Sequence, residues 1–296
     1  MQKIKAIALL GALMISGVAS ADLNTGLVAQ WSFDDCTAID DSGNEHNGAI
    51  QGAPQCVDGV QGKALSFNGQ NDFVEVQDSN GDFSPPDLTV SVWINPNEAQ
   101  LDNAGIIDKS HSLNGDIGGW VLQKRGMGSG LQFYFEYCSS SACANNQDQT
   151  FTTPINKWSH LVITKQGNIV SNYMNGRLLS KKTYSLSDYP KTTKPLLIGA
   201  VKSWNRYFNG SIDEPRIYSR ALTTAEIQAL YYQINPPIIK GTAPWITSHI
   251  VTCQNITQNT TVTIPKTKAS AWDCENAGLS VNSGDKVMIT IEGKKY

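Results

Sequence analysis

The sequence predicts an all-β protein: a two-sheet antiparallel sandwich with one short helix near its C-terminal side. Runs of alternating apolar and polar residues recur about every 8–12 residues, which is typical of sandwich strands. The chain has 25 glycines and 12 prolines, which suit many tight turns between strands. Its 296 residues are 40% hydrophobic and 17% charged, which is a globular composition. Together these features predict an antiparallel sandwich followed by a smaller β unit.

The predicted strands follow from the two-residue period. In residues 26–33, Leu27, Ala29, Trp31 and Phe33 share one face, which predicts a first strand packed on a core. The Asn175-Gly176 pair predicts a type I′ hairpin between two later strands. Beyond a hairpin at 62–76, strands are predicted at 88–96, 104–109, 119–124, 130–137, 158–164, 169–174, 177–184, 195–199 and 210–218.

The helix signal is local and follows the last of these strands. Thr223 and Glu226 have the spacing of a capping box, in which each side chain accepts from the other residue's backbone amide. Ile227, Leu230 and Tyr231 then give a narrow apolar stripe. We expect this helix to lie across an edge or an end of the sandwich.

The first 21 residues have the pattern of a signal peptide that is removed. Lys3 and Lys5 precede an apolar run at 7–18, and residues 19–21 form a small-residue cleavage site. A buried helix would not require these three parts in this order. No other apolar run approaches the ~18 residues needed to span a membrane, so we expect a secreted, periplasmic or cell-surface protein with no membrane span.

Charge argues against a nucleic-acid partner. Without Lys3 and Lys5 the chain has 21 basic and 26 acidic residues, a net charge of −5, and it has no basic stripe.

All six cysteines lie in the exported part, which predicts disulfides. Six cysteines allow 15 pairings. Sequence order favours the three local ones: Cys36–Cys56, Cys138–Cys143 and Cys253–Cys274. Zinc is less consistent with the sequence, because there is no C-x-x-C pair and no histidine cluster.

Composition changes after residue 234. We predict a β-sandwich domain over 22–234, a linker over 235–240 that contains Pro236 and Pro237, and a small disulfide-clipped β domain over 241–296. A tail of this size has little core of its own, so the Cys253–Cys274 bridge would stabilise it.

The turn at 68–72 gathers several oxygen-bearing side chains between two strands. A hairpin tip of this kind can hold a hard cation such as calcium. A solvated polar hairpin is the alternative, and this stretch by itself does not decide between them.

The order of these signals resembles laminin G-like domains of the concanavalin A-like lectin/glucanase superfamily, over residues 24–233. The matching segments are 26–34, 41–48, 62–69, 72–74, 88–94, 157–162, 175–176, 209–214 and 218–222.

The resemblance implies a jelly roll with a structural calcium held by the end of the first strand, the turn after the early hairpin strand and the last strand. Carried over by position, the ligands are Asp34, Asn68 with the Gly69 carbonyl, and Asp213, with Asp72 as a further candidate. The family usually has Asp where this chain has Asn68. One negative charge is lost there, so we expect weaker calcium binding.

Binding of a glycan or glycoconjugate is the function that we expect. Sugars are held by aromatic faces and a few placed polar groups, and the candidates are Trp120, Tyr134, Trp204 and Tyr207. Trp204 and Tyr207 lie in a predicted loop, where an aromatic has less reason to be in the core. For both Trp120 and Trp204, a core role and a ligand role stay equally open.

Two other functions stay open. One is a protein-interaction or adhesion module, and the other is a polysaccharide hydrolase or lyase of the same superfamily. Catalysis is less favoured, because Glu136 stands alone on its strand and no nucleophile motif accompanies the four histidines. Carboxylates from separate strands could still converge.

Overall fold

The computed structural model describes two separate units, one of residues 22–227 and one that combines the N-terminal residues with 228–296. The described residues are 5–6, 22–113, 116–125, 131–138, 143–145, 150–185, 189–201, 204–234, 240–242, 249–255, 260–267, 271–273 and 287–293. The predicted signal peptide lies outside them except for Lys5 and Ala6, and so does residue 274 of the predicted Cys253–Cys274 bridge.

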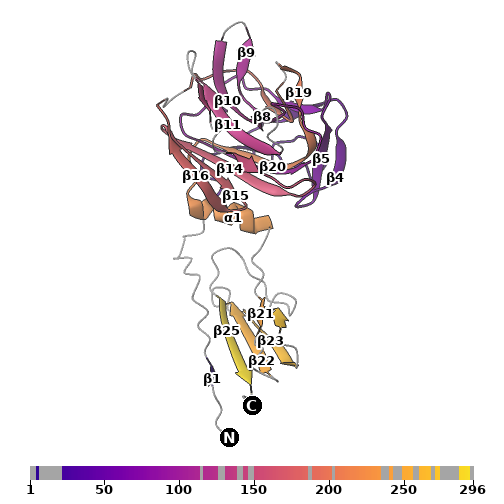
Figure 1. The fold of residues 1–296 in the computed structure, drawn as a ribbon, viewed down its shortest axis with the longest axis vertical. Coiled ribbons are helices and arrows are strands. Elements are labelled where there is room, and N and C mark those ends of the chain that lie inside the picture. The colour runs from indigo at the N-terminus through magenta and orange to yellow at the C-terminus, as the bar shows by residue number, and fades with distance from the viewer. Residues whose placement is uncertain are drawn as a thin grey trace. The chain divides into compact units, whose positions relative to one another are not determined.

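The first unit is the predicted antiparallel two-sheet sandwich (Figure 1). One sheet has eight strands, which are β16 (Arg177–Thr183), β15 (Ile169–Met174), β14 (Ser159–Gln166), β7 (Leu88–Pro96), β20 (Asn209–Tyr218), β5 (Lys63–Asn68) and β4 (Gln55–Asp58) in spatial order, with β2 (Leu27–Gln30) paired to β20.

The second sheet has nine strands and packs on the first. Its spatial order is β12 (Cys143–Asn145), β11 (Gln132–Cys138), β10 (Asp116–Lys124), β8 (Gly105–Asp108), β17 (Leu196–Ile198), β6 (Phe73–Val76) and β3 (Gly48–Gln51), with β13 (Phe151–Thr152) on β11 and β9 (His111–Leu113) on β10. A short hairpin of β18 (Ala200–Val201) and β19 (Arg206–Tyr207) follows β17.

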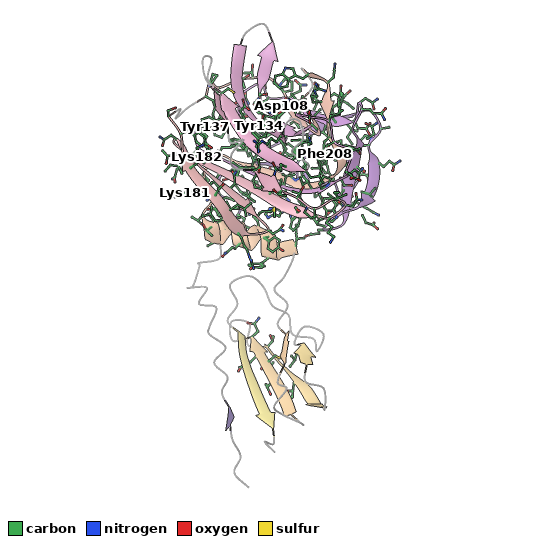
Figure 2. All side chains as sticks on the ribbon, in the orientation of Figure 1. Asp108, Tyr134, Tyr137, Lys181, Lys182 and Phe208 are labelled. Carbon is green, nitrogen blue, oxygen red and sulfur yellow. A yellow bond between two sulfur atoms is a disulfide. The ribbon has the colours of Figure 1, made fainter. Side chains whose placement is uncertain are left out.

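The core lies between the two sheets and is built from the alternating apolar residues of both. On β11, Phe133, Phe135 and Tyr137 are fully buried in it, and they meet Val90 and Val92 of the facing sheet in one cluster. Burial of aromatic and branched side chains at about 25 cal/mol per Å² is the main stabilising term. Figure 2 labels Tyr137 on β11 and Phe208 on the other side of this core.

Two features predicted from short stretches of sequence, a β-turn and a helix cap, are confirmed. Asn175 and Gly176 have φ values of 50° and 73°, as a type I′ turn between β15 and β16 requires. At the start of α1 (Thr224–Ile234), Thr223 N donates to Glu226 Oε2 at 2.7 Å, and Glu226 N donates to Thr223 Oγ1 at 3.3 Å. The capping box predicted from the sequence is therefore present.

The disulfide Cys36–Cys56 is confirmed, with its Cα atoms 5.4 Å apart. Cys138 and Cys143 occupy facing positions of β11 and β12, and both Cys138 and Cys253 are disulfide-bonded.

The second unit contains a four-stranded antiparallel sheet and a separate strand pair. The sheet has the order β1 (Lys5–Ala6), β25 (Val287–Gly293), β22 (His249–Asn255) and β23 (Thr260–Thr267), and the pair is β21 (Lys240–Thr242) with β24 (Ala271–Asp273). The first unit ends at Ile227, within α1, and residues 235–239 of the predicted linker lie outside the described residues. Among the described residues, no helix has the length and hydropathy of a membrane span.

Candidate functional site

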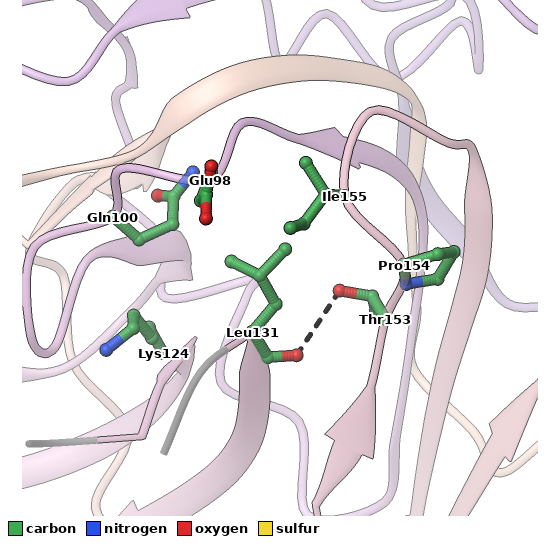
Figure 3. Close-up of a pocket in the computed structure, with 7 residues that line it drawn as sticks. All are labelled: Glu98, Gln100, Lys124, Leu131, Thr153, Pro154 and Ile155. Atoms are coloured by element: carbon green, nitrogen blue, oxygen red, sulfur yellow. Dashed lines mark hydrogen bonds between the residues drawn. The ribbon is translucent and has the colours of Figure 1, made fainter. Parts of the chain in front are cut away.

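A cavity of about 480 Å³ opens at one end of the sandwich (Figure 3). This volume lies within the range of small-molecule sites, about 300–1,000 Å³. Its walls come from the loop after β7, the end of β10, the start of β11 and the loop after β13. The lining residues are Glu98, Gln100, Lys124, Leu131, Thr153, Pro154 and Ile155.

One wall of the cavity is apolar. Leu131 and Ile155 project into the same space in Figure 3, and Pro154 lies beside Ile155. The wall is fixed by Thr153, whose backbone N–H and hydroxyl both donate to the Leu131 carbonyl, at 3.1 and 3.3 Å. An apolar wall of this kind can pack on the C–H face of a ligand.

The facing wall is polar, and Gln100 holds it in place. The Gln100 side-chain oxygen accepts from Asn209 N at 3.0 Å, and its amide group donates to the Asn97 carbonyl at 3.1 Å and to the Asn209 carbonyl. These bonds join residues 97–104 to the start of β20. Gln100 is thereby occupied in positioning the loop.

Two charged residues complete this wall. Lys124 Nζ lies 2.8 Å from Asp102 Oδ1 and also donates to the Arg125 carbonyl at 3.1 Å. Glu98 is exposed, and within the described part of the chain its carboxylate makes no hydrogen bond or ion pair. The sequence gives no motif for this set, because its members come from four loops and strands.

Exposed apolar side chains gather around the same end, which we call the loop end: residues 68–72, 97–104, 153–158 and the β18–β19 tip. Leu101, Ile155 and Trp204 are 42%, 44% and 49% exposed. An exposed aromatic ring at the end of the sandwich where a cavity opens is a common feature of ligand sites.

Strand register places Trp204 at the loop end. Ile198 pairs with Ile107, and Gly199 N donates to the Ile106 carbonyl, so the chain after β17 runs past Gly105 at the start of β8. Only glycine fits there, because a β-carbon on Gly105 would lie 2.6 Å from the backbone of β18. The β18–β19 tip therefore extends beyond the end of β8 that residues 97–104 enter.

The four aromatic residues predicted to bind sugar differ in their exposure to solvent. Trp120 is fully buried, and its indole N–H donates to the Phe83 carbonyl at 2.8 Å. Tyr134 is 3% exposed, and its hydroxyl accepts from Gln123. A surface ligand contacts neither ring, so the predictions for Trp120 and Tyr134 are wrong: strand pairing covers them.

Trp204 and Tyr207 differ from each other. Tyr207 is half-buried, with its ring 6.2 Å from the Phe73 ring. It anchors the hairpin on β6, and its neighbour Trp204 at the tip stays open to ligand.

The predicted calcium ligands fall into two groups. In the first, Asp34 from the turn after β2 and Asp213 from β20 both reach the turn 59–63. Asp34 Oδ1 accepts from Lys63 N at 2.9 Å, and Asp213 Oδ2 accepts from Val60 N at 2.8 Å. Asp213 is fully buried, and its other carboxylate oxygen has no hydrogen-bond partner among the described residues.

Two glycines let the carboxylates approach this turn. A β-carbon at Gly59 would lie 2.4 Å from Asp213 Oδ2, and one at Gly62 would lie 1.8 Å from Asp34 Oδ1. Burial raises the pKa of Asp213 to about 7, although the amides of residues 60 and 61 oppose the rise. Two carboxylates at a glycine-rich turn, one with an unused buried oxygen, are a donor set that fits a hard cation.

The second group closes the turn 68–72. Asn68 Oδ1 accepts from the backbone N–H groups of Gln70, Asn71 and Asp72 at 2.8, 3.1 and 3.3 Å. Both Asp72 oxygens also accept backbone N–H groups, from Ala53 at 2.8 Å and Asn68 at 3.1 Å. The Asn68 oxygen is used within the turn, as in other Asx turns, and the Asp72 oxygens are used by the turn and by the neighbouring Ala53.

The two groups lie at opposite ends of β5, roughly 17 Å apart by strand geometry. Gly69, with φ 72°, belongs to the turn group. The structure therefore does not bring Asn68, Gly69 and Asp72 to Asp34 and Asp213. Among the described residues, no three His, Cys, Asp or Glu side chains are grouped to hold a metal.

A row of carboxylates that sequence reasoning missed crosses the nine-stranded sheet on the face away from the core. Glu75 pairs with Leu197, Leu197 with Asp108, Asp108 with Val121, and Val121 with Glu136. Figure 2 labels Asp108 on this sheet. The row joins strands that are far apart in sequence, so Glu136 looked isolated.

Burial alters the acids of this row. It raises the pKa of Asp108 to about 7 against the opposing hydrogen bonds from Ser110, and it raises the pKa of Glu136. One strand, β10, lies between Asp108 and Glu136, which puts them roughly 10 Å apart by strand spacing. This is near the upper limit of the distance between the two catalytic carboxylates of glycosidases. The hydrolase or lyase alternative stays a prediction, which release of reducing ends from polysaccharides would test.

A laminin G-like family model, described as the concanavalin A-like lectin/glucanases superfamily, matches residues 68–228, more than half of the chain. The chain belongs to this superfamily. A search of curated proteins finds none that matches the laminin G-like chain.

Solved structures share the fold. Domain 4 of AbnA, an extracellular arabinanase from Geobacillus stearothermophilus in complex with arabinotriose, is 24% identical with a TM-score of 0.57, over 69% of this chain and 98% of that one. The binding domain of Paraclostridial Mosquitocidal Protein 1 is 17% identical with a TM-score of 0.57, over 80% and 63%. The binding domain of Botulinum Neurotoxin DC in complex with SialylT is 16% identical with a TM-score of 0.55, over 82% and 62%. The laminin G-like chain thus spans just under two thirds of the toxin domains.

Proposed function

We propose that this laminin G-like protein is an exported, non-catalytic carbohydrate-binding module whose ligand lies at the loop end. The observation that carries the proposal is Trp204, which is half exposed at the end where the cavity opens. The cavity offers an apolar wall and a polar wall, the combination that a sugar ring with a C–H face and hydroxyls requires. Neighbours of the same fold are described with bound arabinotriose and SialylT, which supports carbohydrate as the ligand class.

Export is supported by the signal-peptide pattern of residues 1–21 and by the Cys36–Cys56 disulfide, which forms in oxidising compartments.

Trp204→Ala should weaken glycan binding at least about tenfold, because a stacked ring at the centre of a site is typically worth more than 1 kcal/mol. The fold should survive, since half of the side chain is already exposed. The measurement is a glycan array followed by calorimetric titration of the strongest binder.

Ile39→Ala is the matched control for this experiment. Ile39 is 56% exposed and adjoins Ala38, whose carbonyl binds Gly48 at the opposite end of the sandwich. Unchanged affinity in Trp204→Ala would remove the loop end as the site. A protein partner captured with no glycan signal would favour the adhesion alternative.

We also propose a structural calcium at Asp34 and Asp213. When bound, the ion would supply positive charge to a buried carboxylate and join the first strand, the turn 59–63 and β20. Asp34 and Asp213 would provide its carboxylate oxygens. The support is the glycine-lined approach of both carboxylates to one turn and the unused buried oxygen of Asp213.

Chelation should lower the melting temperature by about 5–10 °C, because saturation at 100 times the Kd is worth about 2.7 kcal/mol and each kcal/mol shifts a domain of this size by about 2–4 °C. Added calcium should restore it. In Asp34→Asn the response should shrink, whereas Asp58→Asn, an exposed carboxylate near the same turn, should respond like the wild type. A melting temperature indifferent to chelator would exclude the ion.

A further inference from the structure

Of the two charged residues that line the loop-end cavity, Lys124 is already neutralised. Lys124 is buried against Asp102, with 2.8 Å between its ammonium nitrogen and the carboxylate oxygen, and a second bond goes to the Arg125 carbonyl. The Arg125 guanidinium approaches Gln132 at 3.4 Å. Among the described lining residues, Glu98 is therefore the charge without a neutralising partner.

The polar groups left for a ligand are mostly acceptors. Gln100 is consumed by backbone bonds, and the Thr153 hydroxyl donates to Leu131, which leaves its lone pairs. A carboxylate such as that of Glu98 accepts hydrogen bonds and donates none. Such a cavity suits a ligand that donates hydrogen bonds, and neutral sugar hydroxyls do so.

Charge distinguishes neutral from acidic ligands more strongly than hydrogen bonding does. A ligand carboxylate or sulfate in this cavity would face Glu98, and the described lining residues offer it no unpaired cation, so like-charge repulsion opposes its binding. The Lys124–Asp102 pair has no net charge to offset this repulsion. A neutral ligand experiences no such penalty.

We propose that the cavity takes an uncharged sugar unit and rejects acidic sugars, with Glu98 as the residue that sets this specificity. The sugar packs its C–H face on Leu131, Pro154 and Ile155 and donates hydroxyl hydrogen bonds to Glu98 across the cavity. This inference rests on the proposed carbohydrate-binding function and adds the class of carbohydrate.

The test compares neutral trisaccharides (arabinotriose, cellotriose and maltotriose) with trigalacturonate by calorimetric titration of the full chain at low and high salt. The wild type should bind at least one neutral probe and bind trigalacturonate at least about tenfold more weakly. Glu98→Lys should raise the affinity for trigalacturonate relative to the neutral probe by about tenfold or more, and added salt should reduce this gain. Glu98→Gln should give an intermediate ratio.

Glu45→Lys is the control, because it makes the same change in net charge at an exposed turn at the other end of the sandwich. Equal binding of neutral and acidic probes by the wild type would overturn the specificity, and so would a Glu98→Lys ratio no different from that of Glu45→Lys. Either result would leave glycan binding intact if Trp204→Ala still loses affinity. Failure of every probe to bind the wild type would overturn both the specificity and the function on which it rests.

Discussion

Replacing Lys109 with methionine should lower the free energy of unfolding by about 3–5 kcal/mol. Lys109 Nζ lies 2.6 Å from Asp78 Oδ2, and both side chains are fully buried. Asp78 also accepts the backbone N–H groups of Asp82 at 2.7 Å and Phe83 at 3.3 Å. The substitution leaves this carboxylate in the interior without its counter-charge, which is the costly half of a buried ion pair.

The matched control is Lys63→Met. Lys63 and Asp58 are 2.8 Å apart, but their side chains are 47% and 93% exposed, so we expect a much smaller loss of stability than for Lys109→Met. Denaturant unfolding followed by tryptophan fluorescence measures both, because the Trp31 ring lies 6.0 Å from the Phe83 ring beside the pair. The double variant Lys109→Met, Asp78→Asn should lose less than the sum of the single losses. Additive losses, or a Lys109→Met variant as stable as Lys63→Met, would contradict the pair's role.

Acid should destabilise the protein through His160 on the order of 3 kcal/mol between pH 6.5 and 4. Burial, and secondarily the positive charge of Arg216, lowers the pKa of His160 to about 3. The ring stacks on Trp93 at 4.9 Å, and its Nε2 lies 2.8 Å from the Ser91 hydroxyl. In the unfolded chain the His160 side chain gains a proton near pH 6.5, whereas in the folded protein it gains one only near pH 3. Stability contributed by neutral His160 is therefore present above pH 6.5 and lost at about 1.4 kcal/mol per unit as pH falls through that window.

The measurement is the difference between wild type and His160→Gln, since other groups titrate in the same range. Burial raises the pKa of Asp108 to about 7, so its contribution has the opposite sign: the folded state holds a proton that the unfolded state releases above about pH 4, and stability falls as pH rises. Subtraction removes that contribution. The variant's unfolding free energy should fall less steeply than the wild type's as pH falls. Parallel curves for wild type and His160→Gln would exclude the buried imidazole as the cause.

The sequence shows its limits most clearly at the tryptophans. Trp120 and Trp204 could not be distinguished from their neighbours in the chain, yet one is fully buried and the other half exposed. Trp120 is covered because β11 and Phe83 come to it from distant parts of the chain. Trp204 stays open because its hairpin continues past the start of β8. Local periodicity carries no information on which strand covers a ring.

The candidate cation site also shows what the sequence could and could not predict. The sequence supplied Asp34 and Asp213, and the structure does bring both to one turn. It also supplied Asn68 and Asp72, whose oxygens close their own turn at the other end of β5. Which residues meet depends on strand register over more than 150 positions, and register is set by core packing across both sheets.

By itself the sequence determined the sandwich class, the type I′ turn at Asn175-Gly176, the capped helix and the Cys36–Cys56 bridge, because each depends on backbone preferences or contacts within about 20 residues. Only the tertiary structure decided the loop-end cavity, which brings Glu98 from the loop after β7 together with Lys124 at the end of β10, and the carboxylate row through Asp108. Those arrangements arise where strands distant in sequence become neighbours, and the packing energy that chooses the neighbours is spread over the whole core.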